Sequence, residues 1–255
     1  MTTSRSIDLN ADIGEHDGDR YASDFALLEV VSSANIACGA HAGSTEVMRA
    51  TIAAAYERGV SIGAHPSYPD REGFGRRDLG LANDAIVRSF EAQVELLAEA
   101  CAVEGAVLAY VKPHGALYNR AAKDAELAHL LAACAFRFDS WLTMLALAGS
   151  ALEHESKAVG LRVAREAFID RAYLADGTLV PRDQMGAVLH DSEAAATRAV
   201  LMARDHEVTA IDGTIIRVDA DSLCVHGDSS NALETILLAR GALEGAGFSI
   251  RSFAP

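Results

Sequence analysis

Short apolar runs alternate along the chain with longer stretches in which apolar residues recur at every third or fourth position. The short runs are typical of buried strands, and the longer stretches are typical of amphipathic helices. The predicted strands cover 6–10, 34–38, 60–64, 107–112, 141–147, 159–163 and 222–226. The predicted helices cover 23–33, 45–58, 83–104, 122–136, 192–204 and 230–246. This alternation predicts an α/β fold with a parallel sheet whose strands are joined by helices.

The number of predicted strands, about seven, favours a (β/α) barrel over an open two-layer sheet. Two segments, 168–190 and 207–221, interrupt the alternation. Each holds an Asp-Gly pair between apolar or β-branched residues, which is typical of a hairpin turn. We therefore expect a single domain over residues 1–255, a barrel with small appended β-hairpins.

Several predicted strands end in a polar side chain next to a Gly or Pro. The carboxyl ends of parallel strands meet at one edge of the sheet, and α/β enzymes build their active sites there. We therefore expect six side chains to gather at one mouth of the barrel: Asp12, His41, His65, Lys112, His114 and His226.

Polar residues also alternate along the first predicted strand. Asp8, Asn10 and Asp12 point to the same face, because successive side chains of a strand point to opposite faces. Buried carboxylates need a partner or a metal to offset desolvation, which favours a functional role over a network that only ties strand to loop. Glu15 either joins these residues or caps the following loop.

Four of the nine histidines end predicted strands. One such histidine is more often structural than catalytic, but four at equivalent positions favour a functional site. A divalent metal could be held by a mixed set of ligands: Asp12, His41, His65 and His114. However, no compact ligand motif such as H-E-x-x-H demands a metal.

Basic residues stand close to these strand ends. Lys112 closes an apolar strand, where its burial is costly unless the ammonium is paired or holds an anion. The 65–77 loop contains Arg71, Arg76 and Arg77, whose planar guanidinium groups could bind a carboxylate or phosphate through two hydrogen bonds. The alternative is a salt-bridged surface loop with its own acidic residues. Two further carboxylates, Glu166 and Asp170, follow another strand, where adjacent arginines could pair with them.

Composition narrows the function classes. The chain has 255 residues and a net charge of −14, which argues against nucleic acid or an anionic membrane as a partner but allows a small-molecule substrate. No apolar run is long enough for a membrane span, and no secretory signal is expected.

The four cysteines are widely spaced, which is typical of free thiols in a reducing cytoplasm. The sequence lacks a phosphate loop, a dinucleotide fingerprint and a nucleophile elbow.

Long segments of the chain resemble the LamB/YcsF family. They are residues 8–15, 35–43, 65–77, 112–119, 166–173 with Gly177 and Pro181-Arg182, and His226-Gly227-Asp228. Two positions depart from the family pattern, since Ala40 replaces a usual bulky aromatic and Ser44 a usual Asp. Neither departure removes a candidate catalytic group.

The resemblance implies a barrel related to the glycoside hydrolase/deacetylase group. It also implies 5-oxoprolinase activity, the ATP-dependent hydrolytic opening of the 5-oxoproline (pyroglutamate) lactam to L-glutamate. ATP with Mg²⁺ and two partner subunits, B and C, belong to this activity. Whether this chain itself binds ATP, and whether it forms a homo-oligomer, stays open.

On this interpretation the candidate catalytic residues are Asp12, His41, His65, Lys112 and His114. The candidate substrate-binding residues are Asp8, Asn10, Asn35, Arg71, Arg76, Arg77, Tyr118, Glu166 and His226. We expect Lys112 and a loop arginine to hold the substrate carboxylate or a phosphate, and Asp12 and His114 to form the acid/base pair. His41 and His65 would orient these groups or bind a metal. Two alternatives stay open, a metal-dependent amide or N-acetyl hydrolase and a non-catalytic lactam- or sugar-binding subunit.

Overall fold

The computed structural model describes residues 5–16, 21–227 and 231–254, and within them seven parallel strands close into a barrel. Each strand pairs with the next in the order β1-β2-β3-β4-β5-β6-β9, and β9 pairs again with β1. The strands are β1 (Arg5–Ile13), β2 (Ser33–Ala37), β3 (Ser61–His65), β4 (Leu108–Val111), β5 (Thr143–Leu147), β6 (Arg162–Phe168) and β9 (Ser222–Val225). The predicted barrel is therefore confirmed.

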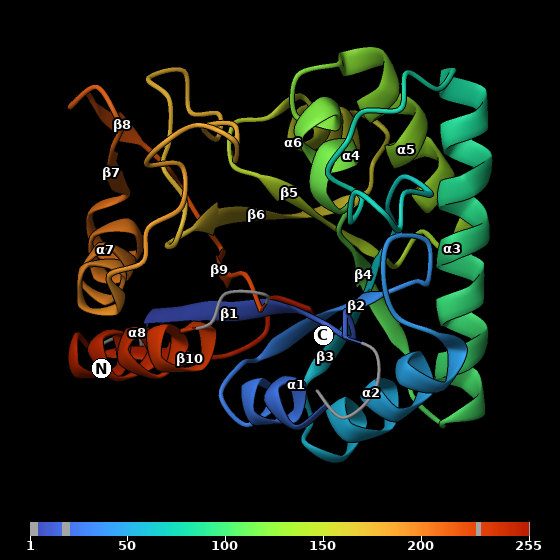
Figure 1. Ribbon diagram of the computed structural model, residues 1–255, viewed down its shortest axis with the longest axis horizontal. Coiled ribbons are helices and arrows are strands. Elements are labelled where there is room, and N and C mark those ends of the chain that lie inside the picture. Colours follow the sequence, from blue (N-terminus) through green and yellow to red (C-terminus); the bar gives the residue numbers. More distant parts are fainter. Residues whose placement is uncertain (1–4, 17–20, 228–230, 255) are drawn as a thin grey trace.

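Helices cover the outside of the barrel (Figure 1). They are α1 (Tyr21–Leu28), α2 (Thr45–Glu57), α3 (Asn83–Val103), α4 (Gly115–Ala121), α5 (Ala125–Phe138), α6 (Ala151–Ala158), α7 (Ser192–Asp205) and α8 (Ala232–Gly245). The long helix α3 lies on one side of the molecule, and α7 and α8 pack together on the opposite side. Among the described residues, no helix combines the length and the apolar character that crossing a bilayer requires.

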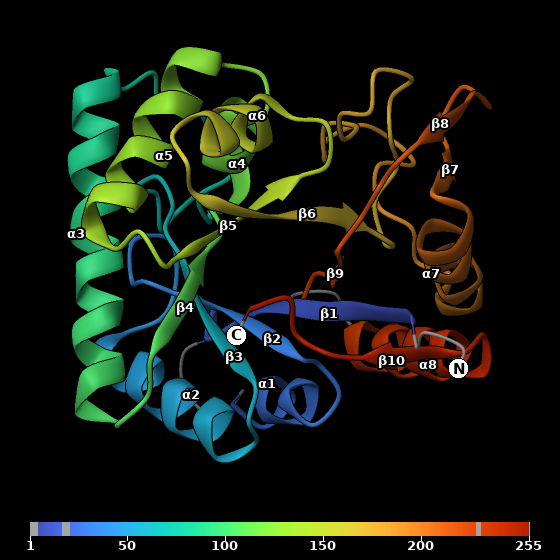
Figure 2. The ribbon, with the colours of Figure 1, turned by 180° about the vertical axis from the view of Figure 1, so that it is seen from behind.

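Both segments that interrupt the alternation carry antiparallel pairing. β7 (Glu207–Thr209) and β8 (Ile215–Arg217) form a two-stranded hairpin next to α7, as Figure 2 shows from behind. In the 168–190 segment, isolated bridges join Arg171 to Val188 and Tyr173 to Leu179, with Gly177 in the turn between the latter two. The hairpin prediction is thus confirmed for 207–221, whereas 168–190 is mostly irregular.

Several sequence-based boundaries are wrong. The predicted helix at 23–33 ends at Leu28, because the chain turns there and Ser32 and Ser33 use their hydroxyls to bind Asp8. The strand predicted at 159–163 is displaced, because Val159 caps helix α6 and β6 runs from Arg162 to Phe168. Helices α4 and α6 and the short strand β10 (Phe248–Ile250), which pairs with β1, were not predicted.

The barrel interior is polar at its centre. Along β1, Leu9, Ala11 and Ile13 belong to the main hydrophobic core, whereas the alternating polar residues bond to other strands across the barrel. Many TIM-type barrels fill this space with Val, Ile and Leu. Here the strands deliver carboxylate, amide and ammonium groups to it, and the candidate site is built on them.

Candidate active site

A cavity of about 740 Å³ opens at the ends of the barrel strands. Five of the six side chains expected at one mouth line it: Asp12, His65, Lys112, His114 and His226. The sixth, His41, lies just behind the wall, where its ring stacks on that of His114 with centroids 3.9 Å apart. The irregular 168–190 segment completes the wall with Phe168, Arg171, Leu179, Pro181 and Arg182.

Lys112 is the central cation of the site. Its side chain is 2% exposed, and Nζ lies 2.9 Å from Asp12 Oδ1 and 2.8 Å from Glu166 Oε1. Burial opposes the charge on the ammonium, but the facing carboxylates outweigh that effect and raise the pKa of Lys112 well above its usual value. Lys112 is therefore a permanent positive charge beside the cavity, not a base.

Asp12 is held as a carboxylate. Burial works against its charge, but Lys112 and His65 outweigh burial and hold the pKa of Asp12 well below its usual range. Asn35 Nδ2 donates to Asp12 Oδ1 at 2.8 Å and to Asn10 Oδ1 at 2.7 Å. Tyr110 in turn donates to Asn35 Oδ1 at 2.8 Å, so a buried network fixes the carboxylate.

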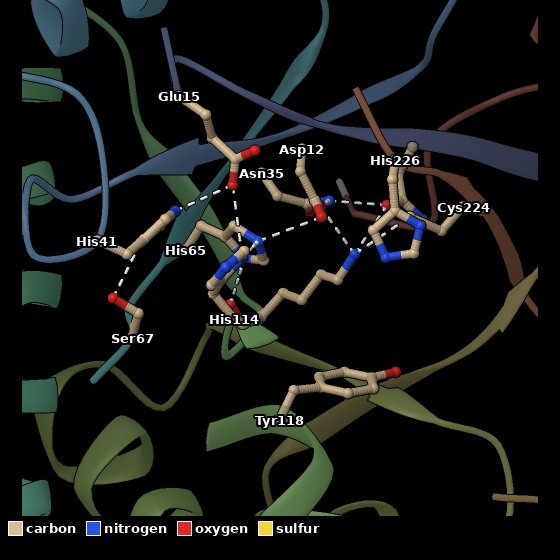
Figure 3. A network of polar contacts seen from close by, with 12 residues as sticks. Asp12, Glu15, Asn35, His41, His65, Ser67, His114, Tyr118, Cys224 and His226 are labelled. Atoms are coloured by element: carbon tan, nitrogen blue, oxygen red, sulfur yellow. Dashed lines mark hydrogen bonds and ion pairs between the residues drawn. The ribbon is translucent and has the colours of Figure 1, made fainter. Parts of the chain in front are cut away.

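A second group of buried residues lies beside Asp12 (Figure 3). His65 Nε2 is 2.9 Å from His114 Nδ1 and 3.4 Å from Asp12 Oδ2. Glu15 Oε1 lies 3.4 Å from His114 Nδ1 and accepts a hydrogen bond from His41 Nε2 at 2.9 Å. Burial lowers the pKa of His41, and it lowers the pKa of His114 strongly, so both rings favour the neutral form. Glu15 therefore joins the site rather than capping the next loop.

The arginine-containing loop at 65–77 closes over these rings. Gly75 has a φ of +65°, and a Cβ there would lie 2.9 Å from the His114 ring and 3.0 Å from His41 Cβ. A larger residue would be strained and would press on both rings. This close approach explains a glycine in a loop otherwise rich in charged residues.

The cavity also carries a His–Asp pair, in which His226 follows β9, the strand that pairs with β1. His226 Nδ1 lies 2.9 Å from Asp170 Oδ2, and the backbone N–H of His226 donates to the same oxygen at 3.0 Å. Burial opposes the charge of Asp170, but its contacts with His226 hold its pKa below the usual value. The carboxylate orients the ring and leaves Nε2 for a substrate, as in acid/base catalysis by histidine.

Tyr118 connects the cavity to the central ion pair. Its hydroxyl donates to Glu166 Oε2 at 2.6 Å, while the other oxygen of Glu166 faces Lys112. Burial raises the pKa of Tyr118 well above its usual value, so the hydroxyl stays protonated. Glu166 is fully buried and positions Lys112 from behind.

Some predicted site residues lie away from the cavity. Asp8 sits deeper in the barrel, where it accepts hydrogen bonds from Ser32, Ser33 and Ser222. Arg71 donates to the backbone oxygens of residues 39 and 43, both at 2.8 Å. Asn10 and Asn35 act within the network under the site and do not line the cavity.

The other two loop arginines differ from each other. Arg77 pairs with Asp70, which fits the alternative role of a residue in a surface salt bridge better than a role in substrate binding. Arg76 lines the cavity, with its guanidinium 4.9 Å from the centre of the Phe74 ring. The mouth also carries Arg120, Lys123 and Arg182, together with the acidic residues Asp78, Asp124 and Asp183.

The sequence did not reveal two pairings. Adjacent arginines were one possible set of partners for Glu166 and Asp170, but Arg165 pairs with Asp221, and Arg171 donates to backbone oxygens. These pairings join residues far apart in the chain, so no local spacing indicates them. Asp228, which belongs to the predicted His226 motif, lies outside the described residues.

The cysteines do not supply a nucleophile. All four are buried and free. Burial raises the pKa of Cys38 to about 12 and that of Cys224 well above its usual value, so both stay protonated thiols. Cys224 Sγ lies 3.2 Å from Lys112 Nζ and serves as packing and as a weak acceptor.

The site therefore combines a fixed cation, a cluster of carboxylates and imidazoles, and a His–Asp pair. The cation can stabilise negative charge on an oxygen, the cluster can take a proton from water, and the histidine can give a proton to a leaving group. These are the groups that hydrolysis of an amide requires.

The chain is similar to proteins of known family and structure. The LamB/YcsF family model matches residues 7–255. A relative from Methylococcus capsulatus, named as the A subunit of 5-oxoprolinase, is 50% identical over 187 residues, which cover 73% of this chain and 72% of the relative. The crystal structure of a lactam utilization protein from Thermus thermophilus superposes with a TM-score of 0.88 at 41% identity, covering 97% of this chain and 100% of the other.

A more distant likeness concerns the fold alone. The structure of T48 deacetylase with substrate has a TM-score of 0.51 at 12% identity, covering 97% of this chain and 87% of the other. The deacetylase-like barrel expected from the sequence is thereby confirmed.

Proposed function

The chain belongs to the LamB/YcsF family, and we propose that it acts as the A subunit of a 5-oxoprolinase. In this role it opens the lactam of 5-oxoproline to L-glutamate, in a reaction coupled to ATP hydrolysis and carried out with subunits B and C. The names of the similar proteins, a 5-oxoprolinase component and a lactam utilization protein, support a lactam as the substrate.

One observation carries the proposal. Buried Lys112 and the neighbouring imidazoles line a cavity that also presents His226, held by Asp170. A lactam bound in this cavity would meet a cation at its oxygen and a proton donor at its nitrogen. Preorganised charges of this kind act strongly on charge that develops during the reaction.

Ring opening then follows in balanced steps. A phosphoryl group from ATP is first transferred to the lactam oxygen, which Lys112 stabilises. Water gives a proton to the cluster of Asp12 and His114 and attacks the lactam carbon. The carbon–nitrogen bond breaks, and His226 protonates the leaving nitrogen. The product is γ-glutamyl phosphate with a free amine, and a second water releases phosphate and glutamate.

We assign the phosphoryl transfer, with ATP and Mg²⁺, to subunits B and C. The chain contains no G-x-x-x-x-G-K-[ST] phosphate loop. The cavity mouth instead carries arginines, of which Arg76 is placed to bind the substrate carboxylate or the transferred phosphate. This chain would then receive the activated lactam and open it.

A second function is favoured by one observation. Asp12, Glu15, His65 and His114 form a group of metal-binding type, which would suit a metal-dependent amide hydrolase acting without ATP. The two functions differ in their requirement for ATP and for partner subunits.

The experiment measures glutamate released from 5-oxoproline by this chain alone and in a mixture with subunits B and C, with and without ATP. The proposal expects ATP-dependent glutamate only in the mixture. Glutamate formed by the chain alone without ATP would favour the amide hydrolase. If B and C are active with a related chain in place of this one, but this chain yields no glutamate, the proposed function is wrong.

A further inference from the structure

The hydrogen bonds of His65 and His114 fix where their protons lie. His65 Nδ1 is 2.8 Å from the backbone oxygen of Lys112, and His114 Nε2 is 2.9 Å from the backbone oxygen of Phe74. A carbonyl oxygen can only accept a hydrogen bond, so each of these nitrogens carries its hydrogen. In the neutral rings, His65 Nε2 and His114 Nδ1 are therefore both lone-pair atoms.

These two lone pairs face each other. The nitrogens are 2.9 Å apart, a distance at which two acceptors repel unless a cation lies beside them. Asp12 Oδ2 is 3.4 Å from the first, and Glu15 Oε1 is 3.4 Å from the second. All four atoms lie within 4.8 Å of one another, and all four residues are buried. Four acceptors thus converge on one small volume.

We propose that Asp12, Glu15, His65 and His114 bind a divalent transition-metal ion, such as Zn²⁺ or Mn²⁺, in the cavity wall. A metal–nitrogen distance of about 2.0–2.1 Å places the ligand atoms of a tetrahedral ion roughly 3.3 Å apart. The separations of 2.9 and 3.4 Å are close to that value. Two imidazoles with two carboxylates suit a transition metal better than Mg²⁺ or Ca²⁺, which prefer oxygen ligands.

Charge balance points to a dication. Asp12, Glu15 and Glu166 bring three buried carboxylates to the interior, and Lys112 brings one positive charge. Among these four groups, two negative charges are left over when the carboxyl groups are ionised and the imidazoles are neutral. A buried excess of this size is costly unless a cation neutralises it, and one divalent ion does so.

Surrounding contacts hold each ligand in place, as is usual around protein metal sites. Backbone oxygens orient the two histidines, Asn35 orients Asp12, and His41 orients Glu15. His41 itself is a positioning residue, because its two nitrogens are engaged by Ser67 at 2.9 Å and Glu15 at 2.9 Å. The proposed site therefore omits His41 from the candidate ligands named in the sequence and adds Glu15.

Three of the ligands, Asp12, His65 and His114, line the cavity, so the ion would be open to water on that side. A metal-bound water loses its proton near neutral pH and becomes a strong nucleophile. Only this consequence rests on the proposed function: with the ion bound, the water that attacks the lactam carbon would lose its proton on the metal, and Asp12 and His114 would act as ligands in place of taking that proton. The binding of the ion rests on the four ligands alone.

The test titrates the full-length chain, freed of metal with a chelator, with Co²⁺ and then Zn²⁺. Calorimetry gives the stoichiometry, and the visible absorption of bound Co²⁺ reports its ligands. The inference expects one equivalent, with Asp12→Asn and His65→Ala each weakening affinity by at least about 100-fold. His129→Ala, at an exposed position paired with Glu155, should bind as the original chain does.

A folded original chain that binds neither ion would overturn the site, and so would equal affinity in the Asp12→Asn and His65→Ala variants. The titration of the original chain tests whether the metal binds, even if a variant fails to fold. One equivalent of metal without glutamate release would support the site and contradict the proposed function. Full glutamate release by chain shown to contain no metal would contradict the metal's role in the reaction.

Discussion

Lys112 Nζ lies 2.8 Å from Glu166 Oε1, which joins the end of β4 to β6 across the barrel interior. Lys112 is 2% exposed and Glu166 is fully buried, so water screens this ion pair little. Asp12 holds the same ammonium from β1. Lys112 therefore ties three strands together and also presents a fixed positive charge to the cavity.

The His–Asp pair is the first place to test the chemistry. Replacing Asp170 with Asn keeps the size of the side chain but removes the charge that holds His226 Nδ1. We expect kcat for ATP-dependent glutamate formation to fall by about 10²-fold or more, because the proton donor loses its orientation. Steady-state assays of the mixture with subunits B and C measure this. Asp84→Asn, at an exposed helix position, is the control, and an unchanged kcat in Asp170→Asn would remove His226 from the mechanism.

A pH dependence of stability follows from Asp8. Burial raises its pKa from 3.8 to about 6, so the folded state binds this proton more tightly than the unfolded chain does. Asp8 thus favours folding most below about pH 4, and this contribution is lost as the pH rises through about 6.

The matched variant is Asp8→Asn, which cannot titrate. The stability of Asp8→Asn relative to the original chain should rise by about 2 kcal/mol between pH 4 and pH 8. Urea unfolding at several pH values measures the difference. A constant difference over this range would show that Asp8 keeps an ordinary pKa in the fold.

Packing inside the barrel gives a third prediction. A Cβ on Gly63 of β3 would collide with the ring of Tyr110, which pairs with Gly63 across the strands and reaches Asn35. Gly63→Ala should cost about 1–3 kcal/mol of unfolding free energy. Gly241→Ala, with open space around it in α8, should instead add about 0.5–1 kcal/mol. Thermal and urea unfolding compare the two, and equal effects would contradict the tight packing at Gly63.

The sequence predicts the barrel because its signals are local. Strand-length apolar runs and helical periodicity recur in order, and the gathering of His65, Lys112 and His114 follows from strand ends alone. The end of β6 was misplaced because Arg165 and Glu166 do not look like a buried strand. Their charges are tolerated through partners on other strands, such as Asp221 and Lys112.

The pairings within the site depend on distant parts of the chain, and the sequence does not indicate them. His226 meets Asp170 across 56 residues, and Glu15 meets His41 across 26. Only the closed barrel brings them together. The same holds for Asp8, whose position on the correct face of β1 was evident but whose depth below the cavity was not.

The central claim is that this chain opens the lactam while its partners use ATP, and Lys112→Met tests it most directly. Only this chain is replaced in the mixture with subunits B and C, and glutamate and ADP are measured in the same samples. We predict that glutamate falls by at least about 10²-fold while ADP is still formed, because the oxygen of the activated lactam loses its cation. Lys157→Met, at an exposed position paired with Glu153, should leave both products unchanged. A folded Lys112→Met chain that supports glutamate formation at the original rate would contradict the account.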